Sequence, residues 1–189
     1  MSIVLASGSP RRYELLKMIG IDDFKVIVDK SDEDITPGLS PQEQVIKLSL
    51  QKAQNVARAC SKDDLIIAAD TLVYLGSEPL GKPDSYDDAK RMLTKLSGHF
   101  HSVFTGVTLL RGNSHISEAE KTDVSFRELS EREITAYVNT GEPMDKAGAY
   151  AAQGGAAIFI ERIEGDFFNV MGLPLCRLSI MLKEYGVTL

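Results

Sequence analysis

The sequence has no tryptophan and only two cysteines, Cys60 and Cys176, among its 189 residues. The cysteines form neither a metal-binding spacing nor a redox pair, so we expect two reduced, buried thiols in a reducing compartment. No apolar run approaches the ~20 residues that a membrane-spanning helix needs. The first residues also lack the basic segment and long apolar core of a signal peptide. We therefore expect a soluble, cytoplasmic protein that does not act at a membrane.

Positive charge is scarce: 21 lysines and arginines stand against 27 aspartates and glutamates, which gives a net charge of -6. This balance provides no general attraction to nucleic acid, so any site for a polyanion must be local. The motifs G-x-S-x-G, H-E-x-x-H, C-x-x-C and G-x-G-x-x-G are absent. His99, His101 and His115 lack a third ligand at a recognised metal spacing, and we expect them on strand surfaces.

Apolar patterns of helical and strand type alternate along the chain, with a hairpin in the middle. They predict a single α/β domain over residues 1–189, with a mixed β-sheet flanked by helices. The expected strands are residues 3–6, 24–28, 65–75, 99–110, 114–126 and 156–163. The expected helices are residues 10–19, 41–60, 85–97, 130–139 and 174–185, with residues 165–172 as a turn or short strand. Capping signals open several of these helices, including Ser40 with Glu43 and Ser130 with Glu133.

The first candidate site is the turn of residues 7–9, which leads into a helix with Pro10 at its first position. Arg11 and Arg12 lie in the first helical turn, where the positive end of the macrodipole disfavours each cation by about 0.3–1 kcal/mol. Free backbone N–H groups and two guanidinium groups at one helix start indicate an anion site, most simply for phosphate. The alternative is that both arginines are solvated or paired with surface acids.

Asp70 ends a continuous apolar run that is typical of a strand buried on both faces. Because α/β folds place ligands at such strand ends, Asp70 could bind a divalent cation or polarise water. Alternatively, it caps a turn together with Thr71. Glu33 could supply a second metal carboxylate, although an acidic loop is usually a solvated surface. Lys52 and Lys82 are surface residues or phosphate ligands, and no P-loop accompanies them.

Residues 142–155 form the longest irregular stretch and are rich in glycine and alanine. Glycines allow a close approach of the backbone to a ligand, and Gln153 can read the edge of a base because its amide both donates and accepts. An ordinary glycine-rich loop explains the composition equally well. Together, the candidate residues indicate an enzyme that acts on a phosphorylated small molecule with a carboxylate-held metal and basic side chains.

These stretches, taken in order, resemble the Maf family of nucleoside triphosphate pyrophosphatases over nearly the whole chain. The motifs that carry the resemblance are Ala6-Ser7-Gly8-Ser9-Pro10-Arg11-Arg12, Ala69-Asp70-Thr71, Gly81-Lys82-Pro83, Leu96-Ser97-Gly98, Gly141-Glu142-Pro143, Asp145-Lys146-Ala147-Gly148-Ala149-Tyr150, Gln153-Gly154 and Gly172-Leu173-Pro174-Leu175. Each motif alone is weak, and the ordered set is specific.

The resemblance implies hydrolysis of a nucleoside triphosphate to the monophosphate and pyrophosphate, in a house-cleaning role. It implies a divalent metal, Mg²⁺ or Mn²⁺. The fold it implies is a single elongated α/β domain with a central cleft, shared with the inosine-triphosphate pyrophosphatases. It also allows a homodimer, for which the residues themselves show no interface. Because the family name derives from septum formation, a nucleotide-binding regulatory protein without turnover is the alternative.

The resemblance also implies residue roles. Asp70 is the proton acceptor, and with Glu33 it belongs to the metal site. The phosphate-binding positions are Ser7, Arg12, Lys52 and Lys82. The positions linked to substrate choice are Arg11, Thr71 and Gln153.

The subgroup with the sequence Pro-Arg-Arg prefers dTTP and UTP. Another subgroup prefers 7-methyl-GTP and has an aromatic residue where Arg11 stands, and Arg11 would repel such a cationic base. Two departures from the family pattern bear on substrate contacts. Asp166 and Phe167 replace a usual Ser-Tyr pair, and residues 151–152 are both alanine before Gln153.

Overall fold

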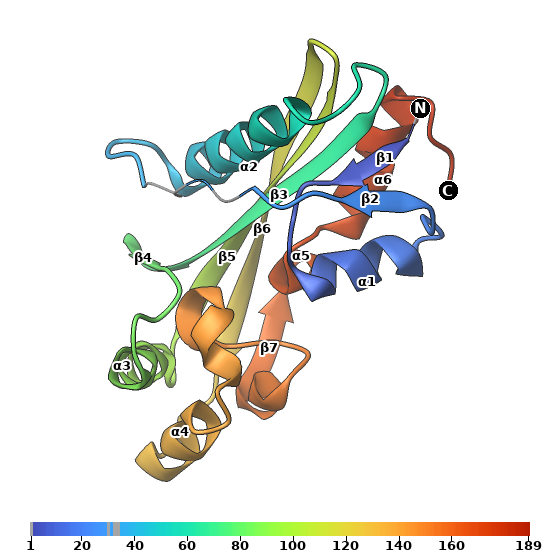
Figure 1. The fold of residues 1–189 in the computed structure, drawn as a ribbon. Coiled ribbons are helices and arrows are strands. Elements are labelled where there is room, and N and C mark those ends of the chain that lie inside the picture. Colours follow the sequence, from blue (N-terminus) through green and yellow to red (C-terminus); the bar gives the residue numbers. More distant parts are fainter. Residues whose placement is uncertain (1, 30, 32–34) are drawn as a thin grey trace. The chain divides into compact units, whose positions relative to one another are not determined.

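The computed structural model describes residues 2–29, 31 and 35–189. Within these residues seven strands form one mixed sheet flanked by helices, which confirms the predicted α/β class (Figure 1). The strands are β1 (Ile3–Leu5), β2 (Phe24–Val26), β3 (Leu65–Leu75), β4 (Glu78–Leu80), β5 (Phe100–Arg111), β6 (Ser114–Phe126) and β7 (Ile160–Glu164). The helices are α1 (Pro10–Met18), α2 (Pro41–Ala57), α3 (Tyr86–Leu96), α4 (Glu131–Val138), α5 (Phe167–Met171) and α6 (Leu175–Glu184).

The strands pair in the order β2-β1-β3-β5-β6-β7, and β4 pairs with the second half of β3. β1 is parallel to both β2 and β3, so Leu5 lies between Val26 and Ile67. Parallel strands need a crossover connection, and α1 and α2 supply it here. The pairs β3–β4 and β6–β7 are antiparallel.

The chain divides into two compact units. The first comprises Met1–Asp70, Thr105–Glu120 and Gly172–Leu189, and the second comprises Thr71–Phe104 and Lys121–Met171. The boundary falls inside β3, β5 and β6, which contribute residues to both units. The single elongated shape and the central cleft concern both units together, and they stay predictions. Among the described helices, none has the length and apolar character to cross a membrane.

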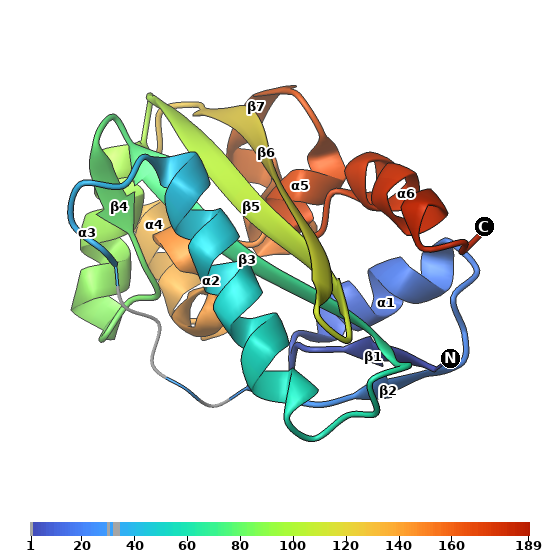
Figure 2. The same ribbon diagram turned by 90° about the horizontal axis from the view of Figure 1, so that it is seen from above.

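The core of the first unit lies on the two faces of β1 and the first half of β3. One face packs against α2, whose capping box at Ser40 and Glu43 forms as predicted. The buried residues of this layer are Val4, Ala6, Ala53, Val56, Ile66, Ala68 and Leu110. Figure 2 shows α1 and α6 on the side of these strands opposite α2. Burial of both faces explains why the run that begins at Leu65 is continuously apolar.

The core of the second unit is aromatic. Phe126 lies edge-on to His101 and Tyr150, with ring centroids 5.0 and 4.9 Å apart, and also contacts Phe159. Helices α3 and α4 close this core with the side chains Ala89, Met92, Leu93, Leu96, Ile134, Tyr137 and Val138.

The placement of His101 on a strand surface is wrong, because its side chain is only 2% exposed. Its Nε2 atom lies 2.8 Å from the hydroxyl of Tyr150. Burial lowers the pKa of His101 from its ordinary value of 6.5 to about 4, although the charge of Asp123 acts to raise it. The imidazole is therefore neutral in the folded protein at neutral pH.

This burial predicts a loss of stability in mild acid. Between pH 6.5, the ordinary pKa of histidine in an unfolded chain, and about pH 4, the pKa of His101 in the folded protein, the unfolded chain binds a proton that the folded chain excludes. The stability of the fold therefore falls as the pH falls through this range. From about pH 7.5 to about pH 5, His101 should lower the free energy of unfolding by about 2 kcal/mol. Urea unfolding at both pH values should show a smaller acid loss in His101→Gln than in the wild type. The exposed His115→Gln variant should behave as the wild type, and an equal acid loss in all three proteins would contradict the prediction.

Three further sequence predictions need correction. Residues 155–159 form a 3-10 helix, η3 (Gly155–Phe159), and only the end of the expected strand 156–163 is extended. The buried residues Ala156 and Phe159 recur with a period of three, which suits this helix. Residues 167–171 form α5, because the Asp166 carboxylate accepts the N–H of Phe168 at 2.7 Å and caps the turn. Finally, Cys176 is exposed and Cys60 is only half-buried, and both are free thiols.

Candidate active site

Ser7 and Arg12 are in direct contact in the first unit. Ser7 follows β1, and its Oγ accepts the N–H of Ser9 at 3.2 Å and a hydrogen bond from Nη1 of Arg12 at 3.1 Å. The Nε of Arg12 donates to the carbonyl oxygen of Gly172 at 2.7 Å, which ties α1 to the segment before α6. These two bonds fix the plane of the guanidinium group beside the helix start. Arg11, the neighbouring cation, is half-buried.

Asp70 and Lys52 form a second direct contact in the same unit. The Nζ of Lys52, on α2, donates to Oδ1 of Asp70 at 2.5 Å, and the side chains are 13% and 4% exposed. Two sequence interpretations change as a result. Asp70 and Thr71 lie inside β3, which continues to Leu75, so Asp70 does not cap a turn. Lys52 is not a surface residue, because its ammonium group pairs with this buried carboxylate.

Ser7 follows β1, and Asp70 lies on the neighbouring parallel strand β3. The N–H of Ala6 donates to the carbonyl oxygen of Ile67 at 2.8 Å, so β1 and β3 remain hydrogen-bonded up to this point. The first unit therefore carries a hydroxyl and a guanidinium group after β1, and an ammonium group and a carboxylate at the neighbouring strand β3. Such a set can bind phosphate oxygens and accept a proton from water.

The second carboxylate oxygen of Asp70, Oδ2, is the main indication of a metal site. Oδ2 is buried, and no described residue donates a hydrogen bond to it. A divalent cation bound through one or two carboxylates and substrate phosphates suits such an oxygen. Glu33, the other predicted metal ligand, lies outside the described residues. Within the described part of the chain, no group of three histidine, cysteine, aspartate or glutamate side chains could hold a metal by itself.

Thr71, Lys82 and Gln153 belong to the second unit. Thr71 is half-buried on β3, whereas Lys82 and Gln153 are exposed. Lys82 follows β4, and the carbonyl oxygen of its neighbour Gly81 accepts the N–H of Gly148 at 3.0 Å. The two motifs that contain Lys82 and Gly148 are thus joined by their backbones. The contacts described for Ser7, Arg12, Lys52 and Asp70 are all made within the first unit.

No sequence pattern predicts a role for Tyr137 or Glu142, yet both contact the segment that carries Gln153. The hydroxyl of Tyr137 donates to Oε1 of Glu142 at 2.8 Å and accepts the N–H of Ala151 at 3.2 Å. The only signal in the sequence is that Glu142 and Gly154 both fall in the motifs of the family resemblance. Side-chain contacts across this irregular stretch could not be read from spacing.

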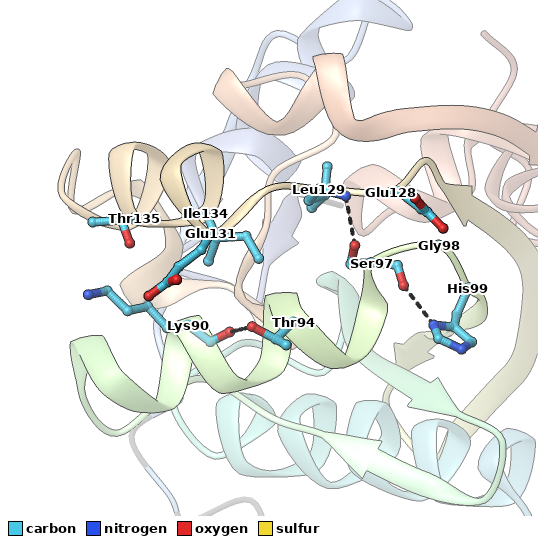
Figure 3. A pocket seen from close by; sticks show the side chains of 10 residues that line it. All are labelled: Lys90, Thr94, Ser97, Gly98, His99, Glu128, Leu129, Glu131, Ile134 and Thr135. Carbon is cyan, nitrogen blue, oxygen red and sulfur yellow. Dashed lines mark hydrogen bonds between the residues drawn. The ribbon is translucent and has the colours of Figure 1, made fainter.

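Figure 3 shows a pocket of about 660 Å³ in the second unit, between α3 and the start of α4. Lys90 and Thr94 line it from α3, and Glu131 and Thr135 line it from α4. Among the residues that the structure describes, no predicted site residue lines this pocket. It therefore takes no part in the candidate site.

Two known proteins are similar to this chain over almost their whole length. A Caldicellulosiruptor bescii protein named dTTP/UTP pyrophosphatase is 48% identical to this chain over 192 residues, which cover 99% of this chain and 96% of that protein. A Methanosarcina mazei protein of the same name is 50% identical over 188 residues, covering 98% and 95% of the two chains.

Solved structures show a similar fold at low sequence identity. The Staphylococcus aureus Ham1 protein matches with a TM-score of 0.52 and 17% identity, covering 98% of this chain and 100% of that chain. A HAM1 protein from Coxiella burnetii matches with a TM-score of 0.51 and 16% identity, covering 97% and 99% of the two chains. The family model described as Maf-like protein matches residues 2–185. This match, together with the relatives of 48% and 50% sequence identity, shows that the chain belongs to the Maf family.

Proposed function

We propose that this chain hydrolyses dTTP and UTP to the nucleoside monophosphate and pyrophosphate. The names of its relatives support the substrate class, and the buried Asp70–Lys52 pair is the observation that carries the chemistry. A carboxylate held by a lysine next to a phosphate-binding turn suits the attack of water on a phosphoric anhydride. A cytoplasmic role in removing unwanted nucleotides belongs to the same proposal.

In this mechanism Asp70 accepts the proton of the attacking water. Lys52 bonds Oδ1 and so fixes the direction of Oδ2, the oxygen that is left to take the proton. The oxygen of the water forms a bond to the α-phosphorus, and the anhydride bond between the α- and β-phosphates breaks. Its electron pair leaves with the pyrophosphate group. Arg12 and the Ser7 turn bind phosphate oxygens, because their donors lie at a helix start.

The remaining predicted residues have supporting roles in the same proposal. Lys82 binds phosphate, and Arg11, Thr71 and Gln153 select the base. Asp70 and Glu33 would hold Mg²⁺ or Mn²⁺, which when bound would neutralise phosphate charge.

A panel of nucleoside triphosphates tests the proposal. The protein is incubated with Mg²⁺ or Mn²⁺ and each nucleotide, and pyrophosphate and orthophosphate are measured separately. We expect pyrophosphate from dTTP and UTP and slow release from 7-methyl-GTP. Preferred release from another nucleotide would reject the base-selecting roles of Arg11 and Gln153. Binding of nucleotides without pyrophosphate would reject hydrolysis in favour of a regulatory nucleotide-binding protein.

A further inference from the structure

The segment that carries Gln153 is held on one side by Tyr137. This residue lies in the last turn of α4 and is only 5% exposed, and its ring lies edge-on to Phe159 with centroids 5.3 Å apart. Its hydroxyl accepts the N–H of Ala151, two residues before Gln153. Burial raises the pKa of Tyr137 well above its usual range, and its hydrogen bond to Glu142 does the same. The hydroxyl therefore remains a donor at every physiological pH.

The same segment is held on its other side by Glu142. Both carboxylate oxygens accept the N–H of Gly155 at 3.1 Å, two residues after Gln153. The carboxylate also occupies the space beside Gly154, where an added Cβ would lie 2.1 Å from Oε1. A side chain at this position would displace the carboxylate from the turn. The N–H of Gly154 donates to the carbonyl oxygen of Ala151 at 3.0 Å, which closes the turn.

The hydrogen bond between Tyr137 and Glu142 joins these two supports. Gln153 therefore projects from a five-residue turn whose first and last N–H groups are bound by one pair of side chains. The side chain of Gln153 itself is exposed. Its position depends on the turn beneath it, and the turn depends on this pair.

We propose that Tyr137 and Glu142 are positioning residues that set the base preference of the enzyme by fixing the turn that carries Gln153. The inference rests on the proposed function and deepens it, since it assigns the selection of the base to a buried pair that need not touch the substrate. A glutamine amide offers one acceptor and two donors, and it can turn over about its last bond. It can therefore pair with uracil or, when turned over, with cytosine.

Discrimination by such a side chain requires a fixed approach to the base. The uracil edge presents an N–H donor and a carbonyl acceptor, whereas the cytosine edge presents an acceptor and an amino donor. If the turn moves, the amide can adjust to either edge. We therefore expect a weakened support to change the ratio of the two activities more than the rate with the better substrate.

The test compares kcat/KM for UTP and CTP in the wild type, Glu142→Gln, Tyr137→Phe and the double variant. Each single variant keeps the shape of the side chain but removes part of the support. The UTP to CTP ratio should fall about tenfold in each, the effect of roughly one hydrogen bond. The effect in the double variant should be smaller than the product of the two single effects, because the bond between Tyr137 and Glu142 is already lost or weakened in each single variant. The exposed Glu161→Gln variant removes one charge in the same unit and should keep the wild-type ratio.

This ratio separates positioning from a general loss of folded enzyme, because unfolding lowers both activities equally. Hydrogen exchange supplies a second measurement: the amides of Ala151 and Gly155 should exchange faster in Glu142→Gln than in Glu161→Gln. An unchanged ratio in folded Glu142→Gln and Tyr137→Phe proteins would overturn the positioning role, even with faster exchange. A wild-type protein that releases no pyrophosphate from either nucleotide would instead overturn the proposed function, and the positioning role with it.

Discussion

Replacing Asp70 with asparagine should lower the rate of pyrophosphate release by about 10²–10⁴, the range expected for removal of a general base. Asparagine has nearly the same shape as aspartate, but its amide cannot take the proton of the attacking water. The Asp70 side chain is only 4% exposed, so bulk water cannot readily replace its carboxylate as a local acceptor. The measurement is pyrophosphate release from UTP at saturating nucleotide and metal.

The same substitution should also destabilise the protein. The Lys52 ammonium group would lose its charged partner at a site where its side chain is only 13% exposed, at a cost of about 3 kcal/mol. Rates should therefore be compared at a temperature where circular dichroism shows a folded variant. The exposed Asp63→Asn variant, in the same unit, is the matched control and should retain the wild-type rate. Full turnover by folded Asp70→Asn protein would exclude Asp70 as the proton acceptor.

Replacing Gly106 with alanine should cause a large loss of stability in the first unit. Gly106 lies on β5, where it faces the backbone of α2. An added Cβ would lie 2.2 Å from the carbonyl oxygen of Val45 and 2.8 Å from the backbone nitrogen of Ile46. Backbone atoms cannot rotate away as a side chain can, so helix and strand must separate. We expect a loss of about 3 kcal/mol or more, at the upper end of overpacking costs.

Urea unfolding followed by circular dichroism measures this loss. Gly81→Ala is a suitable control for the added methyl group, because a Cβ there would meet nothing within 4 Å. Its free energy of unfolding should stay close to that of the wild type. If Gly106→Ala were as stable as Gly81→Ala, the close packing of α2 on β5 would be wrong.

Local elements were predictable wherever the chain supplies its own signals. The capping boxes at Ser40 and Ser130 form as predicted, because a serine and a glutamate three residues later satisfy each other's backbone donors. The apolar run from Leu65 predicted a strand covered on both faces, and β3 has that environment. The expected strand 156–163 failed at its start because η3 buries residues three apart, a pattern that apolar content alone does not reveal.

The sequence by itself determined the α/β class, the family and the residue types available for catalysis, because these depend on periodicity and on an ordered set of motifs. Only the tertiary structure decided which side chains meet. It pairs Lys52 with Asp70, places His101 beside Tyr150, and joins Tyr137 to Glu142. In each of these contacts the two side chains come from different helices, strands or turns. Their distances follow from packing, which spacing along the chain does not encode.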